Sequence, residues 1–286
     1  MHVWRGGYKM TSFQRMIKYL GMALALLITV SIIGGICAAI YGFTSYRNKK
    51  IVSDVKVVSD VIEFGEFSSM DIDSGISNVI IETGDNYAIE TVNVPDTLDV
   101  EIKGETLTIS NREEIVNWFT DKDWTQESKI RITVPTGYNG NKIHLQIGTG
   151  NVSISDVSVD KFIVDGGVGD LTGSNLVIAD VQVDAGVGDV EFEDVDFGKV
   201  DINSGVGNII IEGTIRDDSD FDGGVGNIDL TLLGSRDDYS INVDSGIGGV
   251  YIDGDEIESF DESDHDKPIL ELNGGVGSIT VDFFEN

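Results

Sequence analysis

The sequence predicts an all-β fold: a single-stranded parallel β-solenoid (β-helix) with about 19 residues per repeat, preceded by one transmembrane helix. Three observations predict it. A Gly-rich motif recurs along the second half of the chain, apolar and polar residues alternate on both sides of each copy, and one long uncharged apolar run precedes the repeats. A fixed period of this length is typical of solenoids, in which each repeat contacts only its neighbours.

One repeat is marked by the middle glycine of its Gly-rich motif. Residues five and three positions before the marker, and four and six positions after it, are mostly apolar and alternate with polar residues, as in Val181/Val183 and Val190/Phe192. Alternation with period two indicates a strand with one buried face. The first five markers are 19 residues apart, and the last two follow after 22 and 29 residues. The predicted structural turn glycines are Gly148, Gly167, Gly186, Gly205, Gly224, Gly246 and Gly275.

The corner at each marker has a composition of its own. The residue before the marker is small, as in Gly166, Ala185 and Ser204. Because glycine adopts positive φ without a Cβ penalty, a tight bend is expected at each marker. Asp or Asn usually stands two positions before and three after it, where such side chains bond nearby backbone N–H groups. Since stacked strands lie about 4.8 Å apart, we expect these polar residues to form ladders along the outside.

Charge is distributed very unevenly along the chain. Residues 1–50 hold seven Lys or Arg and no Asp or Glu. Residues 51–286 therefore hold 12 basic residues, the 19 of the whole chain less those seven, and all 50 acidic residues, a balance of -38. This balance excludes a nucleic-acid-binding domain, which needs a basic face for phosphate. The single cysteine, Cys37, lies in the apolar run and excludes an intramolecular disulfide.

The first 66 residues predict a membrane anchor. Residues 1–18 read as a basic cytoplasmic head, 19–46 as a transmembrane helix without a charged residue, and 47–66 as a stalk. About 20 apolar residues of helix span a bilayer core of roughly 30 Å. The slight excess of basic residues in the head favours a cell-membrane protein with an extracytoplasmic C-terminal domain. A cleaved signal peptide ending near Cys37, and a start at Met10, stay open as alternatives.

Residues 67–286 are predicted as the β-solenoid domain, with insertions at 111–128 and 253–268. The first coil is Met70–Ile81, which reproduces the repeat pattern around Gly75 before the pattern is interrupted. The regular repeats then resume in phase with the later copies. The solenoid is therefore expected to begin well before its most obvious part.

Between the first coil and the regular repeats, alternation predicts further strands. A turn at residues 103–105 is expected to make one of them a hairpin. Each coil is expected to rest on its predecessor in the sequence, and Phe283 and Phe284 are expected to cover the open end, because terminal repeats of a solenoid need a cap. The segments that read as strands here are 87–94, 98–110 and 129–134.

The sequence offers no catalytic constellation. His144 beside a strand and His265 in an acidic loop are solitary, and no catalytic or cofactor-binding residue is predicted. Carboxylates about 5 Å apart in a ladder repel by roughly 1–3 kcal/mol. A bound Ca²⁺ would relieve this repulsion, and so would water or the Asn residues that replace Asp in neighbouring copies. The candidate metal ligands are Asp165 and Asp184 in one ladder and Asp170 and Asp189 in another.

Aromatic residues outside the repeat pattern are the candidates for an interaction site. Trp118, Phe119 and Trp124 lie in the insertion 111–128, and the solenoid core does not need them. Clusters of exposed aromatic residues mark binding surfaces. The alternative is that these side chains cover the N-terminal end of the stack.

Three features follow the predicted membrane helix. They are the lead-in Phe67–Ile72, the paired segments Leu98–Ile102 and Leu107–Ile109, and the Gly-x-Gly-Asp/Asn repeats. In this combination the chain resembles the bacterial "putative adhesin" β-strand-repeat domain of unknown function, over about residues 60–283. The resemblance implies a β-repeat fold and carries over no catalytic or ligand residues. The chain departs from the pattern in its Val or Ile between the glycines and in its two long insertions.

These observations lead us to expect a non-enzymatic, membrane-anchored surface module for adhesion or envelope sensing. Residues 19–46 would contact the membrane, and a cell-envelope polymer or protein would be the partner. Two alternatives stay open. One is a structural scaffold that polymerises through unpaired strands at the solenoid ends, and the other is a polysaccharide-active β-helix enzyme, which needs a cleft with a carboxylate pair.

Overall fold

The described part of the chain is built almost entirely of strands. Within it, no helix is long and apolar enough to cross a membrane. The predicted head and transmembrane helix lie outside the described residues, whereas part of the predicted stalk forms a strand. The computed structural model describes residues 57–63, 65–95, 98–111, 127–257, 260–261 and 266–284, all within one compact unit.

The strands fall into a region before the regular repeats, the regular repeats themselves and a C-terminal region. The first region holds β1 (Val57–Glu63), β2 (Ser69–Gly75), β3 (Asn78–Gly84), β4 (Ala88–Pro95), β5 (Leu98–Lys103), β6 (Thr106–Asn111) and β7 (Lys129–Pro135). The second holds β8 (Asn139–Thr149), β9 (Val152–Ser155), β10 (Ser158–Val168), β11 (Leu171–Val187), β12 (Val190–Val206), β13 (Ile209–Ile215), β14 (Ser219–Val225) and β15 (Ile228–Leu233). The third holds the short 3-10 helix η2 (Arg236–Asp238), β16 (Ser240–Ile247), β17 (Val250–Ile252), β18 (Asp255–Ile257), β19 (Phe260–Asp261), β20 (Ile269–Val276) and β21 (Ile279–Phe284).

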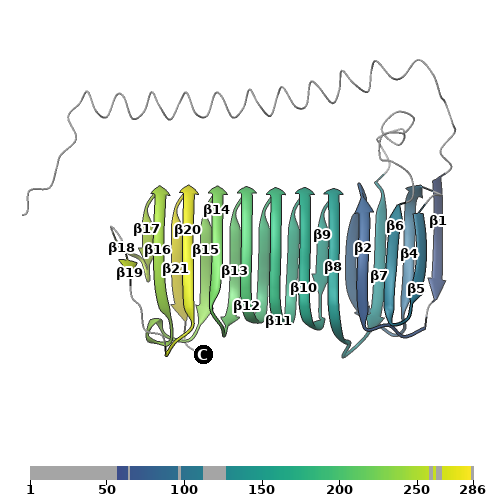
Figure 1. Ribbon diagram of the computed structural model, residues 1–286, viewed down its shortest axis with the longest axis horizontal. Coiled ribbons are helices and arrows are strands. Elements are labelled where there is room, and N and C mark those ends of the chain that lie inside the picture. Colours follow the sequence, from purple (N-terminus) through teal and green to yellow (C-terminus); the bar gives the residue numbers. More distant parts are fainter. Residues whose placement is uncertain are drawn as a thin grey trace, which may run out of the picture. The chain divides into compact units, whose positions relative to one another are not determined.

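Parallel pairing stacks the coils side by side (Figure 1). β8, β10, β11, β12 and β14 pair so that residues 19 positions apart lie opposite each other, as in Asp165 with Asp184 and Asn203 with Asp222. The strands after the glycine corners pair in the same way, β9 with β11 and β13 with β15. The prediction of an all-β fold of parallel stacked strands is confirmed for the described residues.

The last coil does not lie at the end of the stack. β20 pairs with β14 on one side and with β16 on the other, and β21 pairs with β15 and β17. In Figure 1 the yellow β20 therefore stands between β14 and β16. The expectation that each coil rests on its predecessor is wrong here, and so is the expectation that Phe283 and Phe284 cover the end. The final coil fits because its corner has the same Gly-x-Gly form as all the others.

Antiparallel strands close both ends of the stack. At one end β4 pairs antiparallel with β7 and β1, and β5 pairs antiparallel with β6 around Gly104, which confirms the predicted hairpin. At the other end β18 pairs antiparallel with β17, and β19 with β16. These last two strands come from the acidic insertion 253–268, which therefore supplies the end of the stack that the terminal phenylalanines were expected to cover.

The core lies inside the coils and is almost wholly aliphatic and aromatic. Val181 and Val183 point inward from β11, and both are at most 2% exposed. Phe162, Phe192 and Phe197 make edge-to-face contacts, with ring centroids 6.5 and 5.3 Å apart. Since stacked coils bury one continuous apolar column, the outward side chains are free to form surface rows.

Candidate interaction surface on the glycine edge

The glycine corners bring neighbouring coils closer together than any side chain would allow. A Cβ atom at Gly186 would lie 2.3 Å from the carbonyl oxygen of Gly167, and one at Gly188 would lie 2.0 Å from that of Gly169. Gly188 also has a φ of +142°, which L side chains rarely adopt. The prediction that the bend falls at the marker glycines is wrong: each marker lies within a strand, and the positive φ falls on the second glycine of the corner, as at Gly169 and Gly188. The markers, which allow the close approach of neighbouring coils, line one edge of the stack, which we call the glycine edge. Their order along it is Gly148, Gly167, Gly186, Gly205, Gly224, Gly275 and Gly246.

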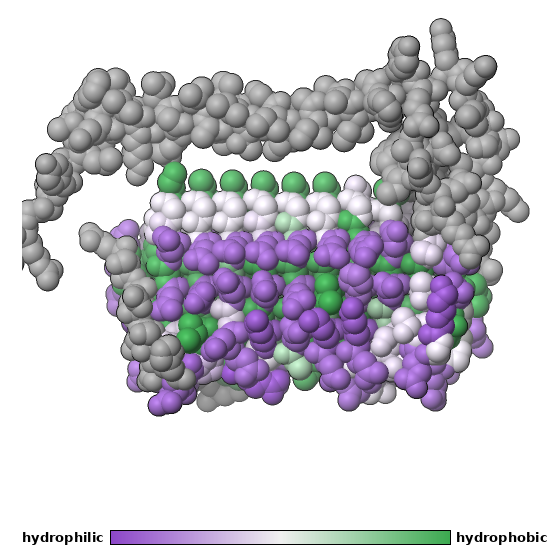
Figure 2. Space-filling model, viewed as in Figure 1, coloured by the Kyte–Doolittle hydropathy of each residue, from purple (hydrophilic) through white to green (hydrophobic). Residues whose placement is uncertain are grey.

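A row of half-exposed aliphatic side chains runs along this edge. Each stands between the two glycines of its corner, and neighbours in the row are paired across adjacent coils. The row is the line of hydrophobic side chains above the pale glycines in Figure 2. We call it the aliphatic ridge; its members, with exposures from 36% to 51%, are Val168, Val187, Val206, Val225, Val276 and Ile247.

Backbone hydrogen bonds hold the ridge in place. The N–H of Gly169 donates to the carbonyl oxygen of Val187 at 2.8 Å, and the N–H of Gly188 donates to that of Val206 at 2.9 Å. The same bond recurs at every later step, up to Gly277 with Ile247. Because each ridge residue is tied to the next coil, the ridge is preorganised and loses little conformational entropy when a partner covers it.

An acidic row borders the ridge on one side, two positions before each marker glycine. Most of its side chains are exposed, and amides separate some of the carboxylates. Asn203 donates from Nδ2 to Oδ1 of Asp184 at 3.1 Å. Such a bond reduces the repulsion between like charges in one ladder. In stack order the acidic row is Asp165, Asp184, Asn203, Asp222, Asn273 and Asp244.

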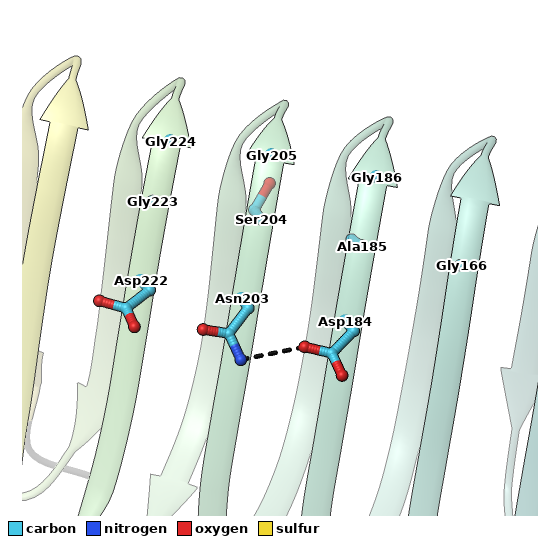
Figure 3. A pocket seen from close by; sticks show the side chains of 10 residues that line it. All are labelled: Gly166, Asp184, Ala185, Gly186, Asn203, Ser204, Gly205, Asp222, Gly223 and Gly224. Atoms are coloured by element: carbon cyan, nitrogen blue, oxygen red, sulfur yellow. Dashed lines mark hydrogen bonds between the residues drawn. The ribbon is translucent and has the colours of Figure 1, made fainter.

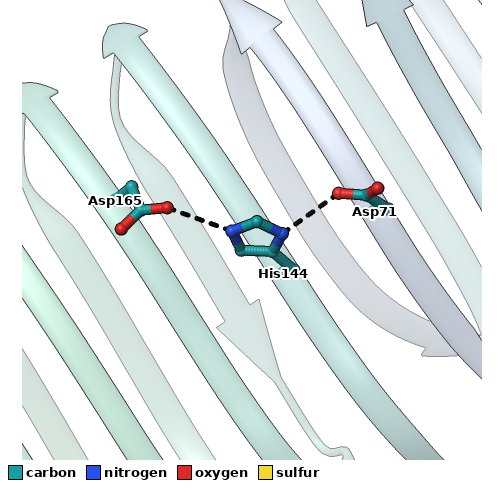
Figure 4. A network of polar contacts seen from close by, with 3 residues as sticks. All are labelled: Asp71, His144 and Asp165. Carbon is teal, nitrogen blue, oxygen red and sulfur yellow. Dashed lines mark hydrogen bonds and ion pairs between the residues drawn. The ribbon is translucent and has the colours of Figure 1, made fainter.

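His144 extends the acidic row toward the first coil (Figure 4). Its Nε2 lies 3.0 Å from Oδ2 of Asp165, and its Nδ1 lies 3.1 Å from Oδ1 of Asp71 on β2. These two contacts join β2, β8 and β10, so His144 links three coils, a structural role that its position beside a strand did not reveal.

A second polar row lies three positions after each marker glycine and serves the coils themselves. The backbone N–H of Asp189 donates to Oδ1 of Asp170 at 3.1 Å, and that of Asn208 donates to Oδ1 of Asp189 at 2.7 Å. The same bond joins Asn227 to Asn208 and Ser278 to Asn227. These side chains satisfy backbone N–H groups of the next coil, as the composition of the corner predicted.

A shallow trough runs along the acidic row, between its side chains and the marker glycines (Figure 3). Each ridge residue directly follows a marker glycine in the sequence, so the ridge lies beside the trough. The volume of the trough is about 520 Å³ over four neighbouring coils, and it is shallow because glycines and the small residues Ala185 and Ser204 line it between the acidic side chains and the marker glycines. Ser204 on its border is 6% exposed, and its Oγ has no hydrogen-bond partner in the described part of the chain. The residues that line the trough are Gly166, Asp184, Ala185, Gly186, Asn203, Ser204, Gly205, Asp222, Gly223 and Gly224.

Carboxylates also gather on the outside of β12, β14 and β20. Asp201, Asp220 and Glu271 lie opposite one another in consecutive strands. Burial, together with the negative charges of Asp222, Glu271 and Asp201, raises the pKa of Asp220, and a backbone N–H bond at Phe221 opposes the shift. Sequence reasoning did not single out Asp220, because only the insertion of β20 places a glutamate beside it.

The structure separates the predicted site residues. Asp165 and Asp184 lie side by side in the acidic row, whereas Asp170 and Asp189 belong to the second polar row. Within the described ranges, no group of three or more His, Cys, Asp or Glu is arranged to hold a metal ion. The remaining candidates, Trp118, Phe119, Trp124 and His265, lie outside the described residues.

Sequence reasoning missed the aliphatic ridge as a surface. The signal was present, because Val or Ile stands between the glycines in six corners. Each of these residues was noted only as a departure from a pattern. A residue flanked by two glycines at a tight bend cannot pack into the core of its own coil, and this argument would have predicted its exposure.

The solved structures to which this chain is similar are distant from it. A "putative adhesin" from Bacteroides fragilis NCTC 9343 is 20% identical, with a TM-score of 0.44, over 80% of this chain and 98% of its own. A "putative cell adhesion protein" from Clostridium sporogenes ATCC 15579 is 14% identical, with a TM-score of 0.37, over 80% of this chain and all of its own. A "putative adhesin" from Parabacteroides distasonis ATCC 8503 is 13% identical, with a TM-score of 0.41, over 81% of this chain and 98% of its own. Among curated protein sequences, none matches the chain.

A family match covers most of the stack. Residues 67–259 match the family described as Toastrack DUF4097, which takes in the first coil, the regular repeats and the start of the acidic insertion. The resemblance to a bacterial β-repeat domain of unknown function, predicted from the repeats, is confirmed by this match. The match spans more than half of the chain's length, so the chain belongs to the Toastrack DUF4097 family.

Proposed function

We propose that this protein is a membrane-anchored, extracytoplasmic, non-enzymatic module for adhesion or envelope sensing, and that its contact surface is the glycine edge. The observation that carries the proposal is the aliphatic ridge. Its six half-exposed side chains form one uninterrupted row, and contiguous exposed apolar surface of this kind marks interaction sites. Isolated exposed aliphatic residues need no such explanation.

The anchor is supported by the N-terminal sequence. Residues 19–46 contain no charged side chain and are long enough to cross a bilayer as a helix. The basic head, with Arg5, Lys9, Arg15 and Lys18, favours a cytoplasmic N-terminus, so the acidic domain lies outside the cell membrane. Protease added to intact cells would cleave the repeats in this orientation and spare them in the opposite one.

Binding would be tested with the full-length chain in membranes. Pull-down of purified envelope polymers and of intact partner cells should be reduced by Val206→Asp together with Val225→Asp, which place charges on the ridge. Val177→Asp is the matched control, because Val177 is 46% exposed but stands off the ridge on β11. Equal binding by the ridge variant and the control would contradict a contact through the glycine edge.

The scaffold alternative receives less support from the fold. End-to-end polymerisation requires a coil of one copy to continue the parallel ladders of the next. Both ends of the described stack instead carry antiparallel strands, β1, β4 and β5 at one end and β18 and β19 at the other. Capping strands of this kind protect a sheet against edge-to-edge pairing.

A further inference from the structure

The glycine edge is an uncharged band on a strongly acidic domain. In all seven coils, the four residues from the one before the marker glycine to the second glycine carry no charge, as in Ala185–Gly188. The acidic row borders the band on one side, and Asp170 and Asp189 border it on the other. The band itself therefore brings no carboxylate into a contact between two domains that each carry a balance of -38.

The band is also complementary to itself in shape. The ridge, seen in Figure 2, runs beside the trough, seen in Figure 3, which is lined by glycines and other small residues between the acidic side chains. One projecting row therefore lies next to one recessed row. If a second copy is turned over, its ridge lies in the trough of the first, and the first ridge lies in the trough of the second. The two acidic rows then lie at opposite outer rims of the contact, each across from the second polar row of the other copy, which holds Asp170 and Asp189, and the carboxylates at the rims stay in water.

The spacing between neighbouring ridge side chains indicates which kind of partner fits the ridge. Ridge side chains recur at the strand spacing of about 4.8 Å. Side chains on one face of an extended peptide recur at about 6.6 Å, and successive turns of an α-helix at 5.4 Å. Either of these would lose register with the ridge within a few coils. Another stack of parallel coils has the same spacing and repeats each ridge contact along the whole edge.

We infer that the partner of the aliphatic ridge is a second copy of this chain, with the ridge of each copy seated in the glycine trough of the other. This inference names the partner of the surface in the proposed function and so rests on that proposal. The contact is small. Seven coils give a strip roughly 30 Å long, and four residues of strand make it roughly 13 Å wide. The total buried area is then below about 1,200 Å², the size of a weak contact, so many copies held on a membrane act together through avidity.

Cysteine cross-linking in the full-length, membrane-bound chain tests this directly. Cys37→Ser removes the native thiol. Val187→Cys then places a thiol on the ridge, and Val177→Cys places one off it on the same strand β11, with the same exposure of 46%. Under mild oxidation we expect several-fold more disulfide-linked dimer from Val187→Cys than from Val177→Cys.

Two further measurements sharpen the result. Adding Val206→Asp, at the neighbouring ridge position, should reduce the dimer of Val187→Cys to the level of the Val177→Cys control, with thermal unfolding used to show that the stack still folds. Raising the salt concentration should increase the dimer fraction, because salt screens the repulsion between two acidic domains. A cationic partner would instead be lost at high salt.

Several outcomes would overturn the inference. Equal dimer formation by the two cysteine variants would mean that two copies do not meet through the ridge. Cross-linking of the ridge thiol to a different protein, or insertion of the ridge into lipid, would identify another partner. With native Cys37 retained, an internal disulfide between Cys37 and the introduced thiol means that the chain's own apolar segment covers the ridge. The proposed function survives any of these outcomes if Val206→Asp together with Val225→Asp still abolishes binding to polymers or cells. If this variant binds normally, the proposed function fails independently of the inference about a second copy.

Discussion

Two buried serines show how differently one hydroxyl can act in this stack. Ser219 is 4% exposed; its Oγ accepts from the N–H of Val200 at 2.9 Å and donates to the carbonyl oxygen of Asp217 at 2.9 Å. Ser204 is 6% exposed, and its Oγ has no partner among the described residues. An unpaired buried hydroxyl costs about 1–3 kcal/mol. Ser204 therefore weakens the stack, whereas Ser219 connects two coils.

Ser204→Ala should raise the free energy of unfolding by about 1 kcal/mol, because it removes the unpaired hydroxyl. The position already tolerates alanine, since Ala185 lies opposite it in the preceding coil. Ser219→Ala is the matched control and should lower the free energy of unfolding by about 1–3 kcal/mol, because a buried backbone N–H loses its acceptor. Denaturant unfolding measures both, and a loss of stability in Ser204→Ala would contradict the assignment.

The carboxylate of Asp220 makes stability depend on pH. Its pKa is raised from the ordinary value of 3.8 by burial and by its acidic neighbours. The folded state then binds the proton more tightly than the unfolded state, so stability is fully present below pH 3.8 and falls as pH rises through the raised pKa. At neutral pH the ionised side chain therefore destabilises the fold.

Asp220→Asn should raise the melting temperature at neutral pH, and the gain should vanish as pH falls toward 3.8. The amide oxygen at this position can still accept the bond that Nδ2 of Asn273 donates to Oδ1 of Asp220. Asp229→Asn, on β15 and away from this cluster, serves as the comparison. A gain for Asp220→Asn that is the same at both pH values would rule out the cluster as its cause.

At the scale of a strand and its corner, two adjacent glycines have different roles. A Cβ atom at Gly167 would lie 2.2 Å from the carbonyl oxygen of Gly148, whereas one at Gly166 would lie 3.5 Å from that of Asp184, an ordinary contact. Gly166 also lines a small cavity of about 20 Å³ inside the corner. Only the second glycine of this pair is therefore required for close stacking.

Gly167→Ala should destabilise the fold by about 3 kcal/mol or more, because the backbone of two coils must separate. Gly166→Ala should instead stabilise it by about 0.4–1 kcal/mol, since the unfolded chain loses conformational freedom. Alanine already occupies the equivalent position in the next coil, at residue 185. Thermal unfolding of the two single variants compares them, and equal effects would mean that the close approach at Gly167 is not what requires glycine.

The corner is also where the sequence was most informative. The alternation around each marker glycine predicted which side chains enter the core. The glycine itself predicted a tight bend, whereas the structure places the positive φ two residues later and uses the marker for a close approach of two coils. The Asp and Asn residues predicted polar ladders, because these side chains bond nearby N–H groups. The ridge was not predicted, because hydrophobic alternation assigns an aliphatic residue to the core unless the bend that exposes it is also considered.

At the scale of the whole stack, the C-terminal coil is an interior part. β20 and β21 separate β14 and β15 from β16 and β17. Deletion of residues 269–286 should therefore do more than shorten the stack. It removes the parallel partners of four strands, so backbone amides of β16 and β17 should exchange with solvent far faster, as hydrogen exchange would show.

A chain ending at Phe284 is the comparison for this deletion, because it keeps the whole of β21. Unchanged protection of β16 and β17 after the longer deletion would mean that they do not depend on the final coil. Loss of protection confined to β18 and β19 would likewise contradict the stack order, since these strands contact only the outer coil.

The order of the last coils could not be read from the sequence. The seven corners with a marker glycine share one Gly-x-Gly form, so each of these coils is an acceptable neighbour for every other, and pattern alone cannot rank the choices. The spacings of 22 and 29 residues between the last markers hinted at a change. The residues that decide the order are the long connections, including the acidic insertion, whose lack of repeat pattern gives no register.

The inward position of the C-terminus has a consequence for biosynthesis. A ribosome releases β16 and β17 before β20 and β21, yet the strands released last must enter between coils that already exist. Assembly in order of synthesis can therefore proceed only as far as β15. Completion of the outer coils waits until β20 and β21 have been synthesised, so the nascent polypeptide must be kept open at that point or be reopened to admit these two strands.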